Sequence, residues 1–488
     1  MNERTTGVRY AMSRPPNSLG TALIATCLLA ITAARPALAE LPPSEDTTAQ
    51  STPAPDPKAP TPSASETLAP DTKTPAPSNS ETLAPDTKAQ NTTVPVAPLV
   101  NPASPEATNP SYPQISGTPG NGITIKTAEA FSLNVKGRIQ LRYQLNVPPK
   151  DAAGKRTNKQ LVTVNTARLT FSGVVFKPEL NYLLQLALGA RDYRDGATSP
   201  VYDAYFDWKP HRDFSIKAGQ FFVPFDRLRT VRESALQLAD RARPVQELSL
   251  DRDVGVVAYS DKFLDEHSPV ALRLGAFGGS GANLSTDKKP GALLVGRVEV
   301  RPLGPIDDDS EGDLDRRAQP GLAIGAAVAE DFRTNRQKAT TGLTFVGGTT
   351  NYAQAATDLA FKWQGAALLA EYLWRRASKD QISSVDATGM PVVEPTRSGS
   401  GWVLQASYLF NPPVEFVARV SKLTAKEGTD PAFIKEVSTR GNELATGLNY
   451  YLNGHKLKLQ TDWIARMPPG FVLDKADHLF HFLIDGTF

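Results

Sequence analysis

The sequence predicts an all-β fold, a transmembrane antiparallel β-barrel of about sixteen strands with a disordered Pro-rich N-terminal tail. Three observations support this fold class. Apolar and polar side chains alternate without interruption over residues 131–147. Shorter segments with the same alternation recur as far as the C-terminus, and the chain ends on an aromatic residue, Phe488. A period of two places successive side chains on opposite faces of a β-strand.

The segment 131–147, FSLNVKGRIQLRYQLNV, is about twice as long as a usual strand of a soluble protein. Its odd positions, from Phe131 to Val147, are apolar, aromatic or glycine, and its even positions are polar or charged. In a membrane barrel about 9 to 11 tilted residues cross the bilayer, apolar toward lipid and polar toward the lumen, and strands often extend beyond it. We therefore interpret the segment as a membrane-spanning strand.

The chain begins with the features of an export signal. Basic residues precede an apolar run, LGTALIATCLLAITAA, and Ala37–Ala39 forms an A-x-A cleavage site. The run of about 16 residues is shorter than the ~20 that a membrane-spanning helix needs. Thr26 is bulkier than the residue that usually precedes an acylated cysteine such as Cys27. Residues 1–39 are expected to be a signal peptide rather than an anchor or a lipoprotein signal, and the mature chain then keeps no cysteine.

Residues 40–121 are rich in Pro, Thr, Ser, Ala and Asp, and they contain SETLAPDTK twice. Such a composition cannot bury a core, so we expect a disordered periplasmic tail. Two interpretations of the tail stay open, a spacer that reaches toward the cell wall and an expendable linker. Residues 122–488 then form the outer-membrane barrel domain.

Composition limits the classes of partner. The formal net charge of +2 at pH 7 is too small to indicate a nucleic-acid-binding protein, and no nucleic acid partner is predicted. A hydrophobic fraction of 40% and a mean hydropathy of −0.30 remain compatible with a membrane barrel, because half of each strand faces water.

The strands alternate with connections of two lengths. Segments after even-numbered strands are mostly short and those after odd-numbered strands are long, as in outer-membrane barrels. One connection, Leu303 to Gly321, is too long for its place and indicates an insertion or a miscount. The expected strands are 131–147, 161–176, 180–190, 201–209, 214–223, 252–260, 270–277, 292–302, 322–329, 357–364, 366–376, 401–410, 414–423, 443–452, 456–465 and 478–488.

Aromatic residues favour a membrane barrel over a soluble β-sandwich. All five tryptophans lie near a strand end on the apolar face, as in the aromatic girdles of outer-membrane barrels, whereas a sandwich would bury them centrally. The last segment alternates up to Phe488 on the lipid face. This ending resembles the outer-membrane assembly signal.

Several segments resemble the phosphate-selective porin O/P family. Gly447–Trp463 is similar to the penultimate hairpin of that family, Lys217–Phe225 to its GQFKVPF stretch, and Arg252–Gly255 to the start of its next strand. The resemblance covers about residues 122–488 and leaves out the Pro-rich tail. It implies a sixteen-stranded, usually trimeric outer-membrane channel whose third outer loop folds inward.

The third outer loop, residues 224–251, would then set the width and the charge of the pore. Its acidic residues nearly equal its basic ones, so strong phosphate selectivity is not expected. An alternative is that residues 231–243 form an amphipathic helix over the barrel mouth. The basic residues predicted for the constriction loop are Arg227, Arg229, Arg232, Arg241 and Arg243.

On the barrel wall, lumen-facing basic residues exceed acidic ones modestly. The first three members of the candidate anion path share one row of the opening strand, and no carboxylate stands in that row, so anions are expected to concentrate there. An alternative for other charges, such as Arg297 and Glu299, is that they neutralise each other as part of the wall. The candidate anion path consists of Lys136, Arg138, Arg142, Arg168, Arg297 and Arg301.

No motif indicates catalysis or a resident metal. The stretch DDDSEGDLD has the spacing of a calcium loop start, but Ala318 stands where a bidentate Glu is expected, which favours a solvated acidic turn. The five histidines fall in no HExxH or triad pattern, and there is no G-x-S-x-G. Neither a metal, a cofactor nor an enzymatic activity is predicted.

The sequence thus predicts a porin of the bacterial outer membrane for passive diffusion of small solutes, with a mild preference for anions such as phosphate. Expected partners are outer-membrane lipid, further copies of the chain in a homotrimer, the barrel assembly machinery through Phe488, and small permeant anions. The alternative is a structural outer-membrane barrel with a plugged lumen and a tail that contacts the cell wall.

Overall fold

A computed structural model describes residues 113–128, 130–189, 199–283, 291–307, 309–410 and 413–488. The predicted signal peptide and most of the predicted tail lie outside the described residues, so both stay predictions. Within the described ranges, no helix combines the length and the apolar character needed to cross a bilayer.

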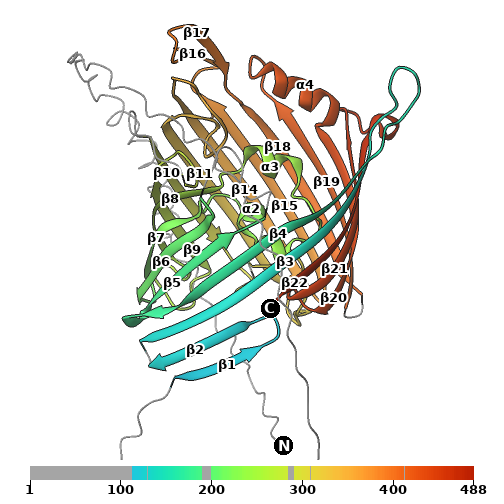
Figure 1. The fold of residues 1–488 in the computed structure, drawn as a ribbon. Helices are drawn as coiled ribbons and strands as arrows, with labels where there is room; N and C mark the ends of the chain where they lie inside the picture. The colour runs from blue at the N-terminus through green and yellow to red at the C-terminus, as the bar shows by residue number, and fades with distance from the viewer. Residues whose placement is uncertain (1–112, 129, 190–198, 284–290, 308, 411–412) are drawn as a thin grey trace, which may run out of the picture. The chain divides into compact units, whose positions relative to one another are not determined.

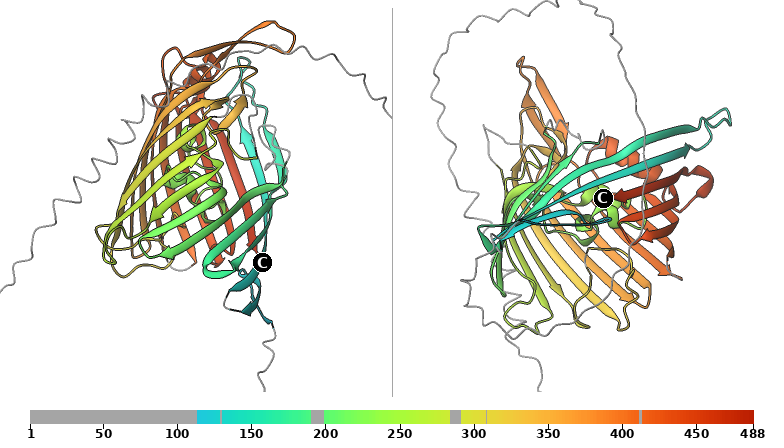
Figure 2. Two further views of the ribbon diagram at one scale, coloured as in Figure 1. Left: turned by 90° about the vertical axis from the view of Figure 1, so that its left-hand side faces the viewer. Right: turned by 60° about the horizontal axis from the view of Figure 1, so that its bottom comes forward.

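Sixteen antiparallel strands form a closed barrel (Figures 1 and 2), which confirms the predicted fold class. Consecutive strands pair around the ring, and β22 pairs with β3 from His478↔Val147 to Thr487↔Arg138, so the ring has no free edge there. The barrel strands are β3 (Phe131–Val147), β4 (Lys159–Val175), β5 (Lys177–Ala187), β6 (Val201–His211), β7 (Phe214–Phe222), β8 (Arg252–Ser260), β9 (Val270–Phe277), β10 (Ala292–Val300), β11 (Gly321–Thr334), β14 (Thr350–Trp363), β15 (Ala366–Ala377), β18 (Gly399–Leu409), β19 (Val414–Ala425), β20 (Asn442–Asn453), β21 (Leu457–Met467) and β22 (Asp477–Thr487).

Each of the expected strands corresponds to one barrel strand. The bounds of β3, β8 and β9 are those predicted, whereas β14 begins at Thr350 rather than at 357. The early part of β14 has alanine on its outer face, at Ala353 and Ala355, so its alternation is weak in the sequence. The long connection before β11, residues 301–320, is an insertion and not a miscount.

A hairpin precedes the barrel and lies at one end of it (Figure 1). It consists of β1 (Gln114–Thr118) and β2 (Gly122–Ala128), and β2 pairs with the first residues of β3, from Phe131 to Val135. The β-structure therefore begins earlier than the predicted domain boundary at 121/122, because β1 lies in the range assigned to the tail.

The C-terminal residue completes the barrel seam directly above this hairpin. Phe488 and Gly137 exchange two backbone hydrogen bonds, each with an N···O distance of 2.8 Å. A Cβ on residue 137 would collide with the Phe488 ring, so only glycine leaves room for it. Phe488 is 62% exposed, which is consistent with the lipid-facing position expected for it. Its part in assembly stays a prediction.

Long connections gather at one end of the barrel, the loop end, and short ones at the other, the turn end. The inserted connection 301–320 belongs to the turn end by its position after β10. The loop-end connections also contain the remaining elements: α2 (Arg227–Thr230), η1 (Glu233–Ala235), α3 (Arg243–Leu248), β12 (Arg336–Lys338), β13 (Thr341–Thr344), β16 (Gln381–Val385), β17 (Pro391–Pro395), α4 (Pro431–Arg440) and η2 (Leu473–Lys475).

The largest cluster of buried apolar side chains lies inside the barrel rather than in its wall. It joins Phe225, Leu228 and Leu248 of the connection after β7 to lumen-facing residues such as Ala327 and Leu373. The outer face instead exposes large apolar side chains, as a lipid-facing surface requires. The connection after β7, residues 223–251, is therefore packed in the lumen.

Candidate functional site

The site is built around residues 223–251, here called the constriction loop, which cross the inside of the barrel (Figures 1 and 2). Helix α3 of this loop packs against β15, β18 and β19. The backbone N–H of Leu228 donates to Glu371 at 2.9 Å, and that of Ala239 donates to Asp462 at 2.6 Å. Both acceptors are lumen-facing wall residues, so the loop enters the lumen.

The alternative of an amphipathic helix over residues 231–243 is wrong. Helix α2 ends at Thr230, only the 3-10 turn η1 follows, and α3 begins at Arg243. The intervening N–H groups of Gln237 and Ala239 bind carboxylates from elsewhere in the lumen instead of helix carbonyls. Long-range side-chain acceptors therefore replace the local hydrogen bonds on which the helix prediction depended.

Small residues in the wall make room for the constriction loop. A Cβ on Gly401 would lie 2.7 Å from Cβ of Pro244, and a Cβ on Gly447 would lie 2.8 Å from Cδ2 of Leu238. Leu238 itself is 1% exposed and belongs to a cluster with wall residues of β19, β20, β21 and β22. The wall and the loop are thus complementary in shape on this side of the barrel.

A buried ion cluster anchors the start of the loop. Arg227 contacts Glu299 of β10 at 2.5 Å and Asp358 of β14 at 2.9 Å. Arg297 binds the same two carboxylates at 3.1 and 2.6 Å. Arg301 approaches Glu299 at 2.7 Å. Because these charges are mutually satisfied, they hold the loop against the wall rather than contribute free charge to a pore.

Three other arginines of the loop are also engaged. Arg229 pairs with Asp251, and Arg243 pairs with Glu436 of α4. Burial alone would raise the pKa of Asp251, but the nearby guanidinium groups lower it to about 2. The Arg241 guanidinium donates to the backbone carbonyls of the loop, and burial together with the charge of Arg229 lowers its pKa to about 10. Arg241 has backbone partners and no carboxylate partner among the described residues.

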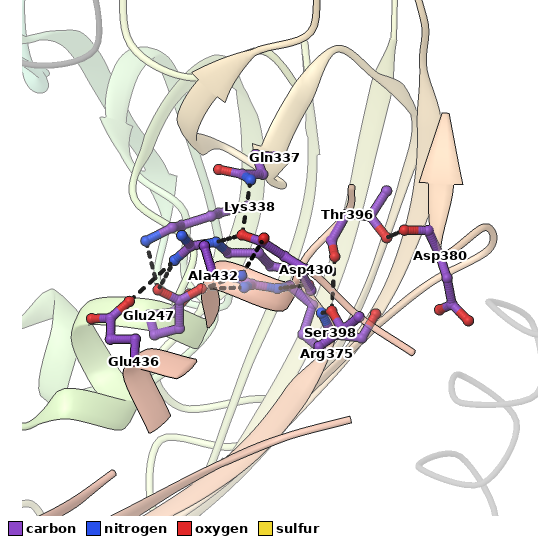
Figure 3. A network of polar contacts seen from close by, with 12 residues as sticks. Glu247, Gln337, Lys338, Arg375, Asp380, Thr396, Ser398, Asp430, Ala432 and Glu436 are labelled. Atoms are coloured by element: carbon purple, nitrogen blue, oxygen red, sulfur yellow. Dashed lines mark hydrogen bonds and ion pairs between the residues drawn. The ribbon is translucent and has the colours of Figure 1, made fainter. Parts of the chain in front are cut away.

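At the loop end, Glu247 of α3 joins the constriction loop to its neighbours (Figure 3). Its carboxylate contacts Lys338 of β12 at 2.5 Å, Arg375 of β15 at 2.9 Å and Arg397 at 3.3 Å. Arg397 also binds Asp430, the N-cap of α4, at 2.9 Å. One buried carboxylate therefore joins two outer connections and strand β15 to the constriction loop, and Arg397 extends the network to α4.

The constriction loop leaves an open cavity of about 760 Å³ on the side of β4 to β10. Among its lining residues, basic side chains outnumber acidic ones by eleven to six. The basic residues are Lys136, Arg138, Arg168, Lys209, Lys217, Arg227, Arg232, Arg241, Arg252, Arg273 and Arg297, and the acidic ones are Asp203, Asp207, Glu233, Asp261, Glu299 and Asp309.

The predicted site residues divide between this cavity and its surroundings. Seven of them line the cavity: Lys136, Arg138, Arg168, Arg227, Arg232, Arg241 and Arg297. Four do not belong to its lining: Arg142, Arg229, Arg243 and Arg301. Structure thus brings most of the predicted bases together, although strand and loop members come from distant parts of the chain.

The first strand has no carboxylate in its basic row, but the expectation that no carboxylate cancels this row is wrong for two of its three members. Arg138 contacts Asp485 of β22 at 2.5 Å, and Arg142 contacts Asp240 of the constriction loop at 2.9 Å. Both carboxylates reach the row from other elements, which alternation within one strand cannot show. Lys136 has no carboxylate within salt-bridge distance among the described residues.

Lys136 and Arg232 are the cavity cations that face open space without a carboxylate partner in the described part of the chain. Arg232 is exposed to the cavity, and it lies close enough to Lys136 for their like charges to interact. By contrast, the adjacent Glu233 pairs with Arg168 at 3.0 Å. Burial would raise the pKa of Glu233, but Arg168 and Arg138 lower it overall.

An arginine–aromatic stack orders the barrel wall beside the cavity. The guanidinium groups of Arg168 and Arg252 lie 3.8 and 3.6 Å from the ring centroid of Tyr202. Arg252 also lies 3.6 Å from the centroid of Phe222 and binds Asp203 at 2.7 Å. The aromatic rings hold both guanidinium groups in fixed positions along the cavity.

The acidic stretch near residue 310, predicted to be a solvated turn, is solvated only in part: Asp307, Asp309 and Asp315 are exposed. Glu311 and Asp313 are 4% and 3% exposed, and Glu311 accepts hydrogen bonds from Gln237 and Gln405. In the described ranges, no group of three His, Cys, Asp or Glu side chains is arranged to hold a metal ion. His455, in the turn after β20, instead contacts Ser310 at 2.9 Å.

Sequence reasoning missed Glu247, Gln237 and Glu311 as residues that position the constriction loop. In the sequence, Glu247 is only one of the acids that balance the loop arginines, and Gln237 belongs to no motif. The unexpected length of connection 301–320 was the one signal that could have directed attention to Glu311. The length alone does not show that the connection folds into the lumen, and only that path brings Glu311 to the constriction loop.

The model of a family described as phosphate-selective porin O and P matches residues 133–467. Among solved structures, the chain is similar to Salmonella typhi OmpF in complex with daunomycin, with 14% identity, a TM-score of 0.47 and coverage of 74% of this chain and 98% of that chain. It is also similar to an anion-selective porin from Comamonas acidovorans, with 12% identity, a TM-score of 0.45 and coverage of 73% and 99%. No curated protein sequence matches it.

Proposed function

Since the chain belongs to the phosphate-selective porin O and P family and is therefore a channel protein of the bacterial outer membrane, we propose that it passes small anions in preference to cations. The turn end then faces the periplasm and the loop end faces the outside. As in the sequence-based prediction, the preference is mild and phosphate is one of the permeant ions.

The observation that carries this proposal is the charge of the cavity beside the constriction loop. Eight of its eleven basic side chains have a carboxylate within 4.0 Å, whereas Lys136, Arg232 and Arg241 have none among the residues that the structure describes. Fields of like charges add in a narrow channel with low-dielectric walls, so anions should concentrate there. Because so many charges are paired, the preference is expected to be mild rather than strong.

The test is the zero-current potential of the purified protein in a planar bilayer across a KCl gradient. In the double variant K136Q/R232Q, we expect the permeability ratio of anion to cation to fall roughly two- to fivefold, because two uncompensated cations are lost. The effect should shrink between about 0.1 and 1 M salt, since the Debye length falls from about 10 to about 3 Å.

A matched control removes charge outside the cavity. Arg212 lies in the turn after β6, pairs with Asp213 at 2.5 Å and does not line the cavity. R212Q should leave the zero-current potential unchanged. An unchanged potential in K136Q/R232Q, with normal barrel assembly, would show that these residues lie outside the conduction path.

A second candidate is a structural barrel with a plugged lumen, and the packing of the constriction loop against half of the wall favours it. Single-channel recording separates the two, because a plugged barrel is silent. We further propose a homotrimer, as the family resemblance implies, with chemical cross-linking of the detergent-purified protein as its test.

A further inference from the structure

The connection 301–320, here called the inserted turn, occupies a place in the topology where the other connections of the turn end are short. Instead of extending into solvent, part of it folds into the barrel. Ile306 joins the apolar cluster inside the lumen. Lys362 of β14, 1% exposed, donates through Nζ to the carbonyls of Asp307 and Ser310 at 2.7 and 2.6 Å.

The inserted turn is also tied to the wall by a buried carboxylate. Asp313 accepts from the backbone N–H of Gly365, in the turn between β14 and β15, at 2.7 Å. It also accepts from the N–H of Arg317 within the inserted turn at 3.1 Å. A buried carboxylate is costly without hydrogen-bond donors, so these contacts hold the inserted turn in place.

The same segment reaches the constriction loop. One carboxylate oxygen of Glu311 accepts from the backbone N–H of Gln237 at 2.8 Å and from Nε2 of Gln405 on β18 at 2.9 Å. Gln237 in turn donates to Ser407 and Glu415 of the wall at 2.6 and 2.5 Å. A single network therefore joins the inserted turn, the middle of the constriction loop and strands β18 and β19.

The contact is tight at one residue. A Cβ on Gly312 would lie 2.5 Å from Oε1 of Glu415 and 2.8 Å from Nε2 of Gln237. Neither neighbour can withdraw freely, because both belong to the network just described. Two residues earlier in the inserted turn, Ser310 contacts His455 of the turn after β20.

We propose that the inserted turn is a second constriction element, which closes the β14–β20 side of the barrel from the periplasmic end and positions the constriction loop through Glu311. The proposal rests on the channel function proposed above. The aqueous path then runs only along the β4–β10 side, and Asp309 of the inserted turn lines it.

The test is single-channel conductance of the G312V variant, combined with liposome swelling in neutral sugars of increasing size. Valine at position 312 must displace either the inserted turn or the side chains of Gln237 and Glu415 that hold it. We expect conductance to rise roughly twofold, because current through a water-filled pore follows its open cross-section. Larger sugars should also enter. A318V adds comparable bulk at an exposed position of the same segment and should change neither quantity.

A milder variant, E311A, removes only the carboxylate that holds Gln237, and it should raise conductance in the same direction by less. Unchanged conductance in both G312V and E311A, with correctly assembled barrels, would overturn the proposal. Failure of both variants to assemble, with normal assembly of A318V, would also contradict it, because the segment would then be a folding element. A silent wild-type protein would instead count against the channel function itself.

Discussion

Two parts of the same barrel differ in how far their lumen-facing side chains are buried. On β11 and β14 to β22, here called the filled wall, lumen-facing residues such as Ala327, Leu373 and Val417 are at most 4% exposed, because the constriction loop and the inserted turn cover them. On β4 to β9, here called the open wall, Lys217 and Tyr259 are only partly buried and line the cavity. The strand pattern is common to both walls, and the loops create the difference.

The comparison shows that position on a lumen face does not define a pore residue. Arg419 faces inward on the filled wall, but it is 4% exposed and binds Glu443 at 2.9 Å. Lys136, near the edge of the open wall, lines the cavity without a carboxylate partner among the described residues. A charge affects permeation only where the loops leave water beside it.

The largest expected effect comes from removing an ion pair under the constriction loop. R227M takes one cation from the buried cluster with Glu299 and Asp358, and we expect a loss of roughly 3–5 kcal/mol in the free energy of unfolding. Denaturant unfolding of the purified barrel in detergent measures it. R273M breaks the more exposed pair with Asp261 on the open wall and should cost less than about 1 kcal/mol. Equal losses in both variants would remove the energetic distinction between the walls.

A purely apolar substitution tests the same distinction without charge. Leu248 is fully buried between the constriction loop and the filled wall, and L248A should cost about 2–5 kcal/mol through the cavity it leaves. Leu183 lines the open cavity and is only partly buried, so L183A should cost less than about 1 kcal/mol. A similar unfolding midpoint for the two variants would show that the loop does not pack as described.

The smallest predicted effect is a gain in stability instead of a loss, and it depends on pH. Asp226, at the start of α2, is 1% exposed, and burial raises its pKa to about 6, although Ser249 donates to it at 2.8 Å. Its protonated form favours the folded state, so its contribution is fully present below about pH 4, where the unfolded group also holds its proton, and is lost as the pH rises through about 6. D226N keeps the acceptor oxygen and cannot ionise. It should be more stable than the wild type at pH 8 by roughly 1–3 kcal/mol and no more stable at pH 4.

A carboxylate whose pKa is lowered instead of raised is the control for that experiment. Asp213 lies in the exposed turn after β6, where the hydrogen bond from Arg212 lowers its pKa. Its contribution is present above the unfolded pKa and is lost as the pH falls. D213N should therefore gain no stability at pH 8. A gain in both variants would indicate a general effect of net charge instead of the burial of Asp226.

Much of the barrel follows from local pattern. Alternation over 131–147 defines β3 to the residue, and the same rule places Arg297 and Glu299 on the lumen face together. It works because covalent geometry turns successive strand side chains to opposite faces whatever lies beyond them. It fails at the start of β14, where alanines stand on both faces, Ala353 outward and Ala356 inward, so the two faces do not differ clearly in polarity.

What the sequence by itself determined is the fold class, the strand count, the inward set of charges and the family resemblance. Only the tertiary structure decided which of those charges remain open to water. Arg138 is paired because the barrel seam sets Asp485 beside it, and the helix expected over 231–243 is absent because lumen carboxylates bind its N–H groups. Strand register and loop path join residues that are hundreds of positions apart, and no local periodicity records such contacts.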